Sequence, residues 1–206
     1  EACGALEAID FSMEDKVIEE EIGAIIVATG FSHFDPSVMT EYGYGRFPNV
    51  ITSMEMERIN NSAGPTHGAL IRPSDGKEPK NLAFINCVGS RDKRYVQSCS
   101  NFCCMYSIKN AILAKQMHPG TEITVYYMDI RTPSKGYEEF YDRAREMGIR
   151  FVLGRPAMIT EDPETHNLTV HGEDTMLGQV VSREFDMVML NQAAIPQPDQ
   201  NHMSSV

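Results

Sequence analysis

The sequence predicts an α/β protein built around a parallel β-sheet. Between residues 81 and 154, apolar runs of strand length alternate with segments of helical apolar spacing, in the order β-α-β-α-β. The chain has 206 residues, of which 42% are hydrophobic, and this is enough to bury a real core. Alternation of strands and helices is typical of a Rossmann-like sheet, because a crossover helix connects each strand to the next parallel one.

The N-terminal part of the chain predicts a hairpin. Two apolar runs, ALEAIDF and KVIEEEIGAIIVATG, are separated by the polar turn SMED. The second run is expected to lead into a buried strand at residues 24–28, because five apolar residues follow one another there. That strand would end at Thr29 and Gly30.

A short helix and a connector are expected next. Thr52 or Ser53 would cap a helix that runs through Asn60, and Glu55 would lie favourably in its first turn. Residues 61–80 are rich in Pro, Gly and Ser, and we interpret them as a boundary between two subdomains.

The alternating region follows the connector. Strands are predicted at residues 81–88, 122–130 and 149–154, and helices at residues 101–118 and 136–148. Turn residues then separate three further short strands, which we expect to form a meander: 156–162, 167–173 and 183–190.

Composition excludes two classes of partner. The net charge is −11, with a pI near 5.0 and scattered basic residues, so a nucleic-acid surface is not expected. No apolar run approaches the roughly 18 to 20 residues of a membrane span, and residues 23–30, the strongest run, have the length of a strand. Nothing near the N-terminus resembles a signal peptide. We therefore expect a cytoplasmic protein without direct membrane insertion.

Four of the five cysteines gather within the stretch CVGSRDKRYVQSCSNFCC, as Cys87, Cys99, Cys103 and Cys104. In a Rossmann unit a Gly-rich turn after the first strand holds a dinucleotide phosphate, but here that turn reads C-V-G-S-R-D and keeps only Gly89 of the pattern. A nicotinamide cofactor is therefore not expected in this crevice. Strand end and helix start would bring the four thiols together instead.

Spacing leaves four interpretations of these thiols. A [4Fe-4S] cluster on four cysteine ligands suits the pattern best. Zinc sites made of cysteine usually use two spaced pairs, and a thioredoxin-type dithiol uses Cys-x-x-Cys, which C-x3-C-C does not supply. Reduced cysteines in an apolar core are the fourth. Cys3 lies 84 residues before Cys87 and is not expected to take part.

Several strings resemble one family. SAGPTHG, FINCVGSRD, SCSNFCCMYSIKNA and YYMDIRTPSKGYEEFY resemble the A-type subunit of heterodisulfide reductase (HdrA) and its relatives, which include flavoprotein subunits of the quinone-interacting membrane-bound oxidoreductase complex. The resemblance is specific because the cysteine pattern, MDIR and KGYEEFY occur together and in order. The resemblance implies a thioredoxin-reductase-like module of two nested Rossmann domains, one for FAD and one carrying a [4Fe-4S] cluster. It also implies that Cys87, Cys99, Cys103 and Cys104 are the cluster ligands.

The resemblance extends to the flavin. The string ATGF matches the strand-end motif that contacts FAD in such flavoproteins, so Ala28, Thr29 and Gly30 are the implied flavin-side residues. Residues 1–80 would be a partial FAD-domain segment with its connector, 81–191 the Rossmann-like domain with the cluster site, and 192–206 a tail. The G-x-G-x-x-G that would bind the FAD pyrophosphate is absent. We therefore expect an internal fragment of a longer protein, with FAD belonging to the full-length parent.

The function that the resemblance implies is electron transfer. The chain would relay electrons between FAD, the cluster and partner subunits of a heterodisulfide-reductase-type complex, with a ferredoxin-like carrier as a further partner. No catalytic residue is expected, and the isolated fragment is expected to be an inactive part of an oxidoreductase. The alternatives are a docking or assembly module that binds zinc or no metal, and a pyridine-nucleotide-dependent reductase. Asp129 and Arg131 follow a predicted strand and would either hydrogen-bond near the cluster crevice or form a local ion pair.

Overall fold

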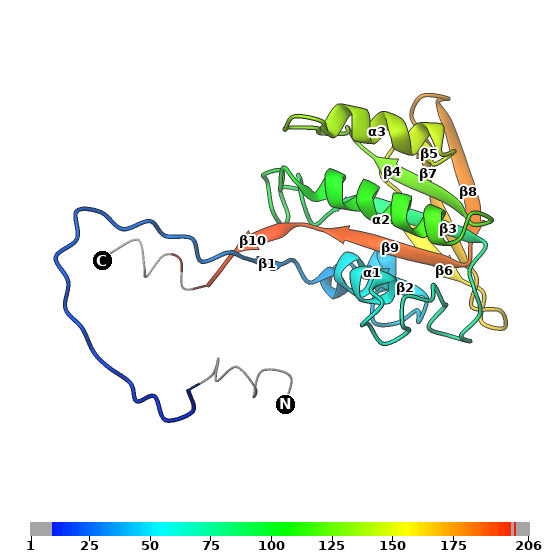
Figure 1. The fold of residues 1–206 in the computed structure, drawn as a ribbon. Helices are drawn as coiled ribbons and strands as arrows, with labels where there is room; N and C mark the ends of the chain where they lie inside the picture. Colours follow the sequence, from blue (N-terminus) through cyan, green and yellow to red (C-terminus); the bar gives the residue numbers. More distant parts are fainter. Residues whose placement is uncertain (1–9, 199, 201–206) are drawn as a thin grey trace. The chain divides into compact units, whose positions relative to one another are not determined.

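A computed structural model describes residues 10–198 and residue 200. The chain divides into two units, one made of residues 1–29 with 199–206 and the other of residues 30–198. Each helix and strand of the described residues lies in the second unit (Figure 1). This second unit carries the candidate site.

A five-stranded sheet forms the centre of this unit. All of its neighbouring strands are parallel. Their order across the sheet is β2 (Val50–Thr52), β9 (Met187–Gln192), β3 (Asn81–Val88), β4 (Glu122–Tyr127) and β5 (Arg150–Leu153).

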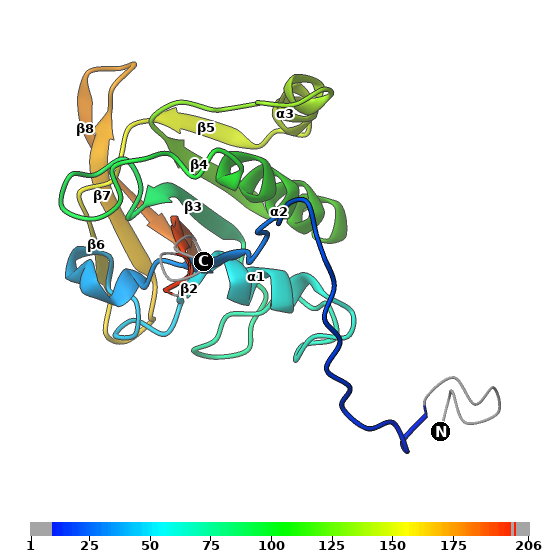
Figure 2. The ribbon, with the colours of Figure 1, turned by 90° about the vertical axis from the view of Figure 1, so that its left-hand side faces the viewer.

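One face of the sheet is covered by helices and the other by a small antiparallel sheet, which gives three layers (Figures 1 and 2). Because side chains alternate along β3, Leu82 and Phe84 belong to the core under the helices, whereas Ala83 and Ile85 belong to the core on the opposite face. The helices are α1 (Ser53–Asn60), α2 (Cys103–Met117) and α3 (Tyr137–Glu146), and the antiparallel sheet contains β6 (Met158–Glu161), β7 (Leu168–Asp174) and β8 (Gln179–Phe185).

The remaining elements flank this arrangement. Two short 3-10 helices, Pro36–Val38 and Thr40–Tyr42, lead towards β2. Strand β1 (Phe31–His33) pairs with β10 (Ala194–Pro196) as an antiparallel ribbon. No helix in the described part of the chain is long and apolar enough to cross a membrane.

The structure confirms the predicted α/β class and the β-α-β-α-β order. The run β3-α2-β4-α3-β5 follows the predicted elements in type and sequence. The predicted helix cap is confirmed as well: Thr52 Oγ1 accepts a hydrogen bond from the backbone N–H of Glu55, whose carboxylate accepts one from the backbone N–H of Thr52. These features follow from local sequence patterns.

The third strand of the predicted meander is wrong. Residues 183–190 divide at Asp186 between β8, which belongs to the antiparallel sheet, and β9, which lies between β2 and β3 in the central sheet. All six residues of β9 are buried, as expected for a strand covered on both faces. The Asp186 carboxylate accepts hydrogen bonds from the backbone N–H groups of Lys80 and Asn81, which holds the crossing point against the start of β3.

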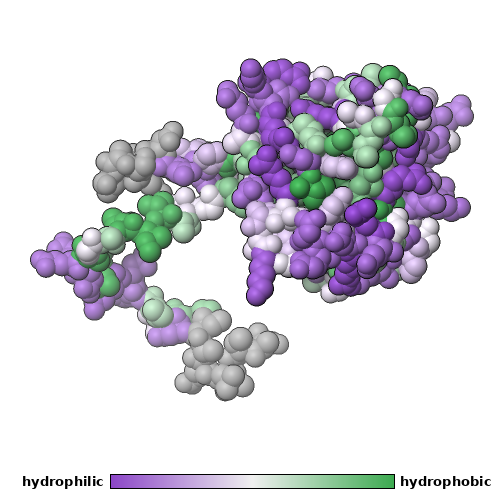
Figure 3. Space-filling model, turned by 90° about the horizontal axis from the view of Figure 1, so that it is seen from above, coloured by the Kyte–Doolittle hydropathy of each residue, from purple (hydrophilic) through white to green (hydrophobic). Residues whose placement is uncertain are grey.

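The predicted buried strand at residues 24–28 is also wrong. Residues 10–29 contain no helix or strand, and Ile25 and Ile26 are 67% and 92% exposed. The physical reason is that a strand needs a hydrogen-bonding neighbour, and no described residue pairs with this segment. Its apolar side chains stand out as a hydrophobic stretch in Figure 3. The first arm of the predicted hairpin lies mostly outside the described residues.

The expected subdomain boundary near residue 80 falls inside one compact unit. Strand β2 and helix α1 precede it, yet β2 pairs with β9 and α1 packs in the core under the helices. The assignment of residues 1–80 to a flavin-binding domain stays a prediction. Of the expected tail at 192–206, residues 194–196 form β10, and residues 199 and 201–206 lie outside the described residues.

Candidate functional site: a four-cysteine crevice at the start of α2

Strand β3 ends in an irregularity that redirects Cys87. The pairing register with β9 shifts between Ile85 and Val88, and Cys87 itself has φ of 61°. Strict alternation would place Cys87 on the same face as Ala83 and Ile85. A bulge with a left-handed residue breaks that alternation, and a non-Gly residue in this conformation costs about 1–2 kcal/mol. Strain of this kind gathers at functional sites.

The loop between β3 and α2 folds back on itself. The Val96 N–H donates to the Gly89 carbonyl at 3.0 Å, and Ser90 Oγ donates to the Ser98 carbonyl at 2.8 Å. These bonds bring Cys99, which is half-buried, back towards the end of β3. The Asn101 N–H in turn donates to the Cys99 sulfur at 3.3 Å. Cys99 therefore lies in the loop, four residues before the helix, rather than within the helix start.

Helix α2 begins with the two adjacent cysteines. Cys103 and Cys104 are 1% and 3% exposed, and Phe102 in the cap position makes no side-chain capping bond. The N-terminus of a helix favours negative charge, and of these two thiols it is Cys104 whose pKa is lowered. Asn191 Nδ2 donates to the Cys103 carbonyl and to Asn86 Oδ1, both at 2.8 Å, and this buried pair fixes the helix start on the ends of β9 and β3.

The loop after β4 closes the remaining side of the crevice. Cys104 Sγ contacts the Asp129 carbonyl at 3.9 Å, and Arg131 of the same loop contributes to the lowered pKa of Cys104. The Asp129 carboxylate is bonded by the Arg91 guanidinium from the β3–α2 loop and lies 3.6 Å from Arg131 Nε. An ion pair thus joins the two loops that surround the thiols.

The acidities of the thiols show that they influence one another. Burial, with smaller contributions from Cys104 and Cys99, raises the pKa of Cys87 to about 11. A hydrogen bond from Cys103 to Cys104 raises the pKa of Cys103 and lowers the pKa of Cys104 to about 7. Cys99 and Cys87 also raise the pKa of Cys103. Four cysteines from three segments therefore share one electrostatic environment.

This donor set fits an iron-sulfur cluster chemically. Its donors are four sulfurs, three of them buried, at or near the N-terminus of α2. The buried Asn86 Nδ2 has no hydrogen-bond partner, although its residue neighbours Cys87 and its Oδ1 is bonded to Asn191. Among the described residues, no three His, Cys, Asp or Glu side chains form a group that could hold a single metal ion.

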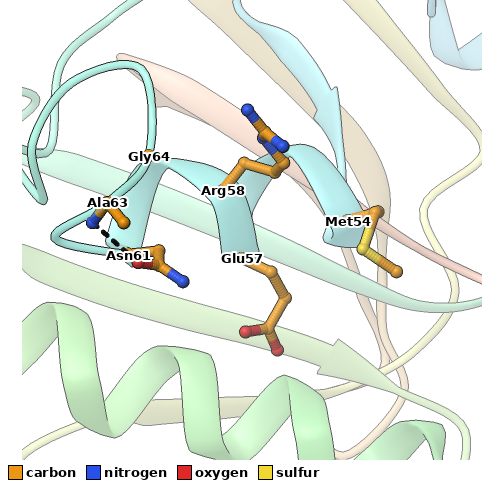
Figure 4. Close-up of a pocket in the computed structure, with 6 residues that line it drawn as sticks. All are labelled: Met54, Glu57, Arg58, Asn61, Ala63 and Gly64. Carbon is orange, nitrogen blue, oxygen red and sulfur yellow. Dashed lines mark hydrogen bonds between the residues drawn. The ribbon is translucent and has the colours of Figure 1, made fainter. Parts of the chain in front are cut away.

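Two pockets lie near the helices but outside this crevice. The first, of about 230 Å³, follows the exposed side of α1 and is lined by Met54, Glu57, Arg58, Asn61, Ala63 and Gly64 (Figure 4). The second, of about 330 Å³, is lined mainly by apolar side chains of β1, α1 and the start of α2, among them Phe31, Phe102 and Tyr106. No cysteine lines either pocket.

Comparison with known proteins shows close relatives. The chain is 53% identical over 202 residues to the A-type iron-sulfur subunit (form 2) of the CoB–CoM heterodisulfide reductase of Methanopyrus kandleri, covering 97% of this chain and 31% of that protein. It is 50% identical over 207 residues to the corresponding A-type subunit of Methanocaldococcus jannaschii, covering 100% and 31%. The chain belongs to the HdrA family of heterodisulfide reductase. It spans about a third of the length of these curated relatives.

Other comparisons add context to this family membership. The A-type subunit of the H2:CoB-CoM heterodisulfide,ferredoxin reductase of Methanothermobacter thermautotrophicus is 53% identical over 191 residues, covering 92% of this chain and 29% of that protein. No protein-family model matches the chain. Among solved structures, the thioredoxin reductase of Lactococcus lactis is 14% identical with a TM-score of 0.49, covering 82% of this chain and 44% of that one.

In this member of the HdrA family, the predicted cluster ligands lie in different surroundings from the predicted flavin-side residues. The four cysteines influence one another's pKa values, and their role as ligands stays a prediction. Ala28 and Thr29 are exposed in the extended segment 10–29, and Gly30, with φ of 76°, directly precedes β1. Their contact with FAD also stays a prediction.

Two residues of the crevice were not anticipated. Asn86 and Asn191 are polar residues near the ends of two buried strands, within the otherwise apolar strings FINCV and VMLN. A polar residue inside such a run is the signal that would have found them, because a buried amide needs partners. Asp129 and Arg131 were anticipated near the crevice, and both the expected hydrogen bonding and the expected ion pair are present.

Proposed function

We propose that this chain is the cluster-carrying electron-transfer segment of a heterodisulfide-reductase-type oxidoreductase of the cytoplasm. Cys87, Cys99, Cys103 and Cys104 would hold a [4Fe-4S] cluster, which supplies one-electron chemistry when bound. The observation that carries the proposal is the redirected Cys87, because the bulge at the end of β3 gives a buried strand cysteine the same electrostatic neighbours as the cysteines of the next helix.

The names of the relatives support this proposal. The Methanopyrus and Methanocaldococcus relatives are iron-sulfur subunits by name, and the Methanothermobacter relative belongs to a heterodisulfide,ferredoxin reductase. We infer that the partners of the whole protein are the other subunits of such a complex and a ferredoxin-like carrier. In the full-length protein, Ala28, Thr29 and Gly30 would contact FAD, and the chain would relay electrons between that flavin, the cluster and the partners.

The residues of the chain would act by holding and shielding the sulfur ligands rather than by acid-base chemistry. Helix α2 begins at the thiolates, where its first N–H groups favour negative charge, while Asn191 fixes the backbone of Cys103. Three of the four sulfurs are buried, so water has little access to them. Access of water influences the reduction potential of a bound cluster.

Anaerobic reconstitution with iron and sulfide tests the ligand assignment. The wild-type chain is expected to take up about four irons and four sulfides, the stoichiometry of a [4Fe-4S] cluster. Cys103→Ser is expected to lose most of this iron and the broad visible absorption. Cys3→Ser is the matched control and should behave as wild type, since Cys3 lies far from the four in sequence.

Three outcomes would overturn the assignment. They are equal iron uptake by the wild type and Cys103→Ser, zinc without sulfide in the purified wild type, and failure of the wild type to bind iron. Flavin content measured on the full-length parent tests the FAD contact separately.

A further inference from the structure

A charged cluster lies beside the cysteine crevice, on the two loops that enclose it. Arg91 is in the β3–α2 loop, and Asp129 and Arg131 are in the loop after β4. Their side chains are 26%, 47% and 44% exposed, so they sit between the buried thiols and solvent. Arg91 has φ of 57°, and its backbone N–H donates to the Ser98 carbonyl. The conformation of this residue is therefore held from both its backbone and its side chain.

These charges lie close to the thiols. Arg91 lies four residues after Cys87, and its backbone N–H donates to the carbonyl of Ser98, the residue before Cys99. Asp129 lies on the other loop with its carbonyl 3.9 Å from Cys104 Sγ, so its carboxylate is also close to the crevice. The same carboxylate is bonded to Arg91. One ion pair thus places two opposite charges beside the crevice.

We propose that the Arg91–Asp129 pair sets the reduction potential of the cluster held by the four cysteines. This inference rests on the proposed function. Reduction by a one-electron donor adds one negative charge to the cluster, so a nearby cation stabilises the reduced form and a nearby anion destabilises it. Both residues are positioning residues, because neither supplies a ligand sulfur.

We expect substitutions of the two residues to shift the midpoint potential of the cluster in opposite directions. Removing the cation by Arg91→Met should lower the midpoint potential, whereas removing the anion by Asp129→Asn should raise it. A merely structural role would move both variants in the same direction, since each breaks the same ion pair between the same two loops. We expect each equilibrium constant for one-electron reduction to change about tenfold, which is about 59 mV.

The experiment is a redox titration of the anaerobically reconstituted chain with dithionite, followed by electron paramagnetic resonance of the reduced cluster. Arg91→Lys keeps the charge and should stay close to the wild-type potential. Arg94→Met is the matched control, because Arg94 belongs to the same loop, is 64% exposed and is bonded to Asp92 instead. It should leave the potential unchanged. Iron and sulfide content of every variant is measured first.

The outcomes separate this inference from the proposed function. A wild-type chain that binds no cluster overturns both. A cluster of normal composition whose potential moves in the same direction in Arg91→Met and Asp129→Asn, or in neither, overturns only the tuning role. If Arg91→Met fails to bind iron, Asp129→Asn and Arg91→Lys decide: a raised potential in the first and an unchanged one in the second support the inference, and any other pair of results contradicts it.

Discussion

Two left-handed residues of the backbone shape the crevice at the scale of single residues. Cys87 has φ of 61° and Gly89 has φ of 76°, with only Val88 between them. Gly89 adopts this conformation without strain, because it lacks a Cβ. A Cβ at this position would collide with the ring of Phe34, which is almost buried and contacts Tyr95. Gly89 is therefore required by packing as well as by its backbone.

Gly89→Ala should destabilise the chain markedly. Left-handed strain and the collision with the Phe34 ring together are expected to cost about 2–4 kcal/mol in the free energy of unfolding. Urea unfolding followed by circular dichroism measures it. Gly120→Ala is the control, because no atom lies within 4 Å of a Cβ there. Equal stability of the two variants would show that the turn at Gly89 adapts without cost.

At the scale of elements, helices α1 and α2 begin in opposite ways. Helix α1 has a complete capping box made by Thr52 and Glu55. Helix α2 begins at Cys103 without any side-chain cap. Side chains bond the N–H groups of Thr52 and Glu55 at the start of α1, whereas the Met105 N–H at the start of α2 is bonded only to the backbone carbonyl of Phe102. Side-chain capping thus distinguishes the start of α1 from the start of α2, where the proposed ligands Cys103 and Cys104 lie.

Thr52→Ala should weaken the start of α1. Losing the capping hydroxyl is expected to lower the free energy of unfolding by about 1 kcal/mol. Thr52→Ser keeps the hydroxyl and should recover most of that loss, so the comparison of the two in urea isolates the cap from the loss of the buried methyl group. Identical midpoints for Ala and Ser would argue that Glu55 alone satisfies this helix start.

The elements also show how far sequence reasoning reaches. Periodicity predicted β3-α2-β4-α3-β5 correctly, because each of these elements is defined by its own residues. It could not place β9 between β2 and β3, since that pairing joins residues more than 100 positions apart, such as Ala83 and Val188. The redirected Cys87 was likewise out of reach, because a one-residue bulge leaves the apolar pattern of FINCV unchanged.

At the scale of the whole molecule, the described residues of the two units differ in how far their apolar side chains are buried. Residues 30–198 contain two buried cores, one on each face of the central sheet. Residues 10–29 contain no helix or strand, and the exposed apolar side chains of this segment include Val17, Ile22, Ile25 and Ile26. Local unfolding is not needed to expose the backbone of such a segment to a protease.

Thermolysin, which cleaves before large apolar residues, should therefore cut this chain first within residues 17–27. The expected product under native conditions retains the whole of residues 30–198, and its mass identifies the site. Digestion in denaturant is the control, in which cuts are spread over the chain. An early native cut inside β3 or α2, with residues 17–27 still protected, would contradict the difference between the units.

The ribbon formed by β1 and β10 brings the entry and the exit of the second unit together. Phe31 lies opposite Pro196 in the register of this antiparallel pair, at the two ends of the unit's sequence. A unit whose ends meet can be inserted into a loop of a host protein without stretching that loop. The unit also allows circular permutation. A short linker would join its two ends, and new ends would be opened in the exposed turn between β7 and β8, which leaves the sheets unchanged. Residues 31–196 could therefore be transferred as one unit into another protein, and the cysteine crevice would be transferred with them.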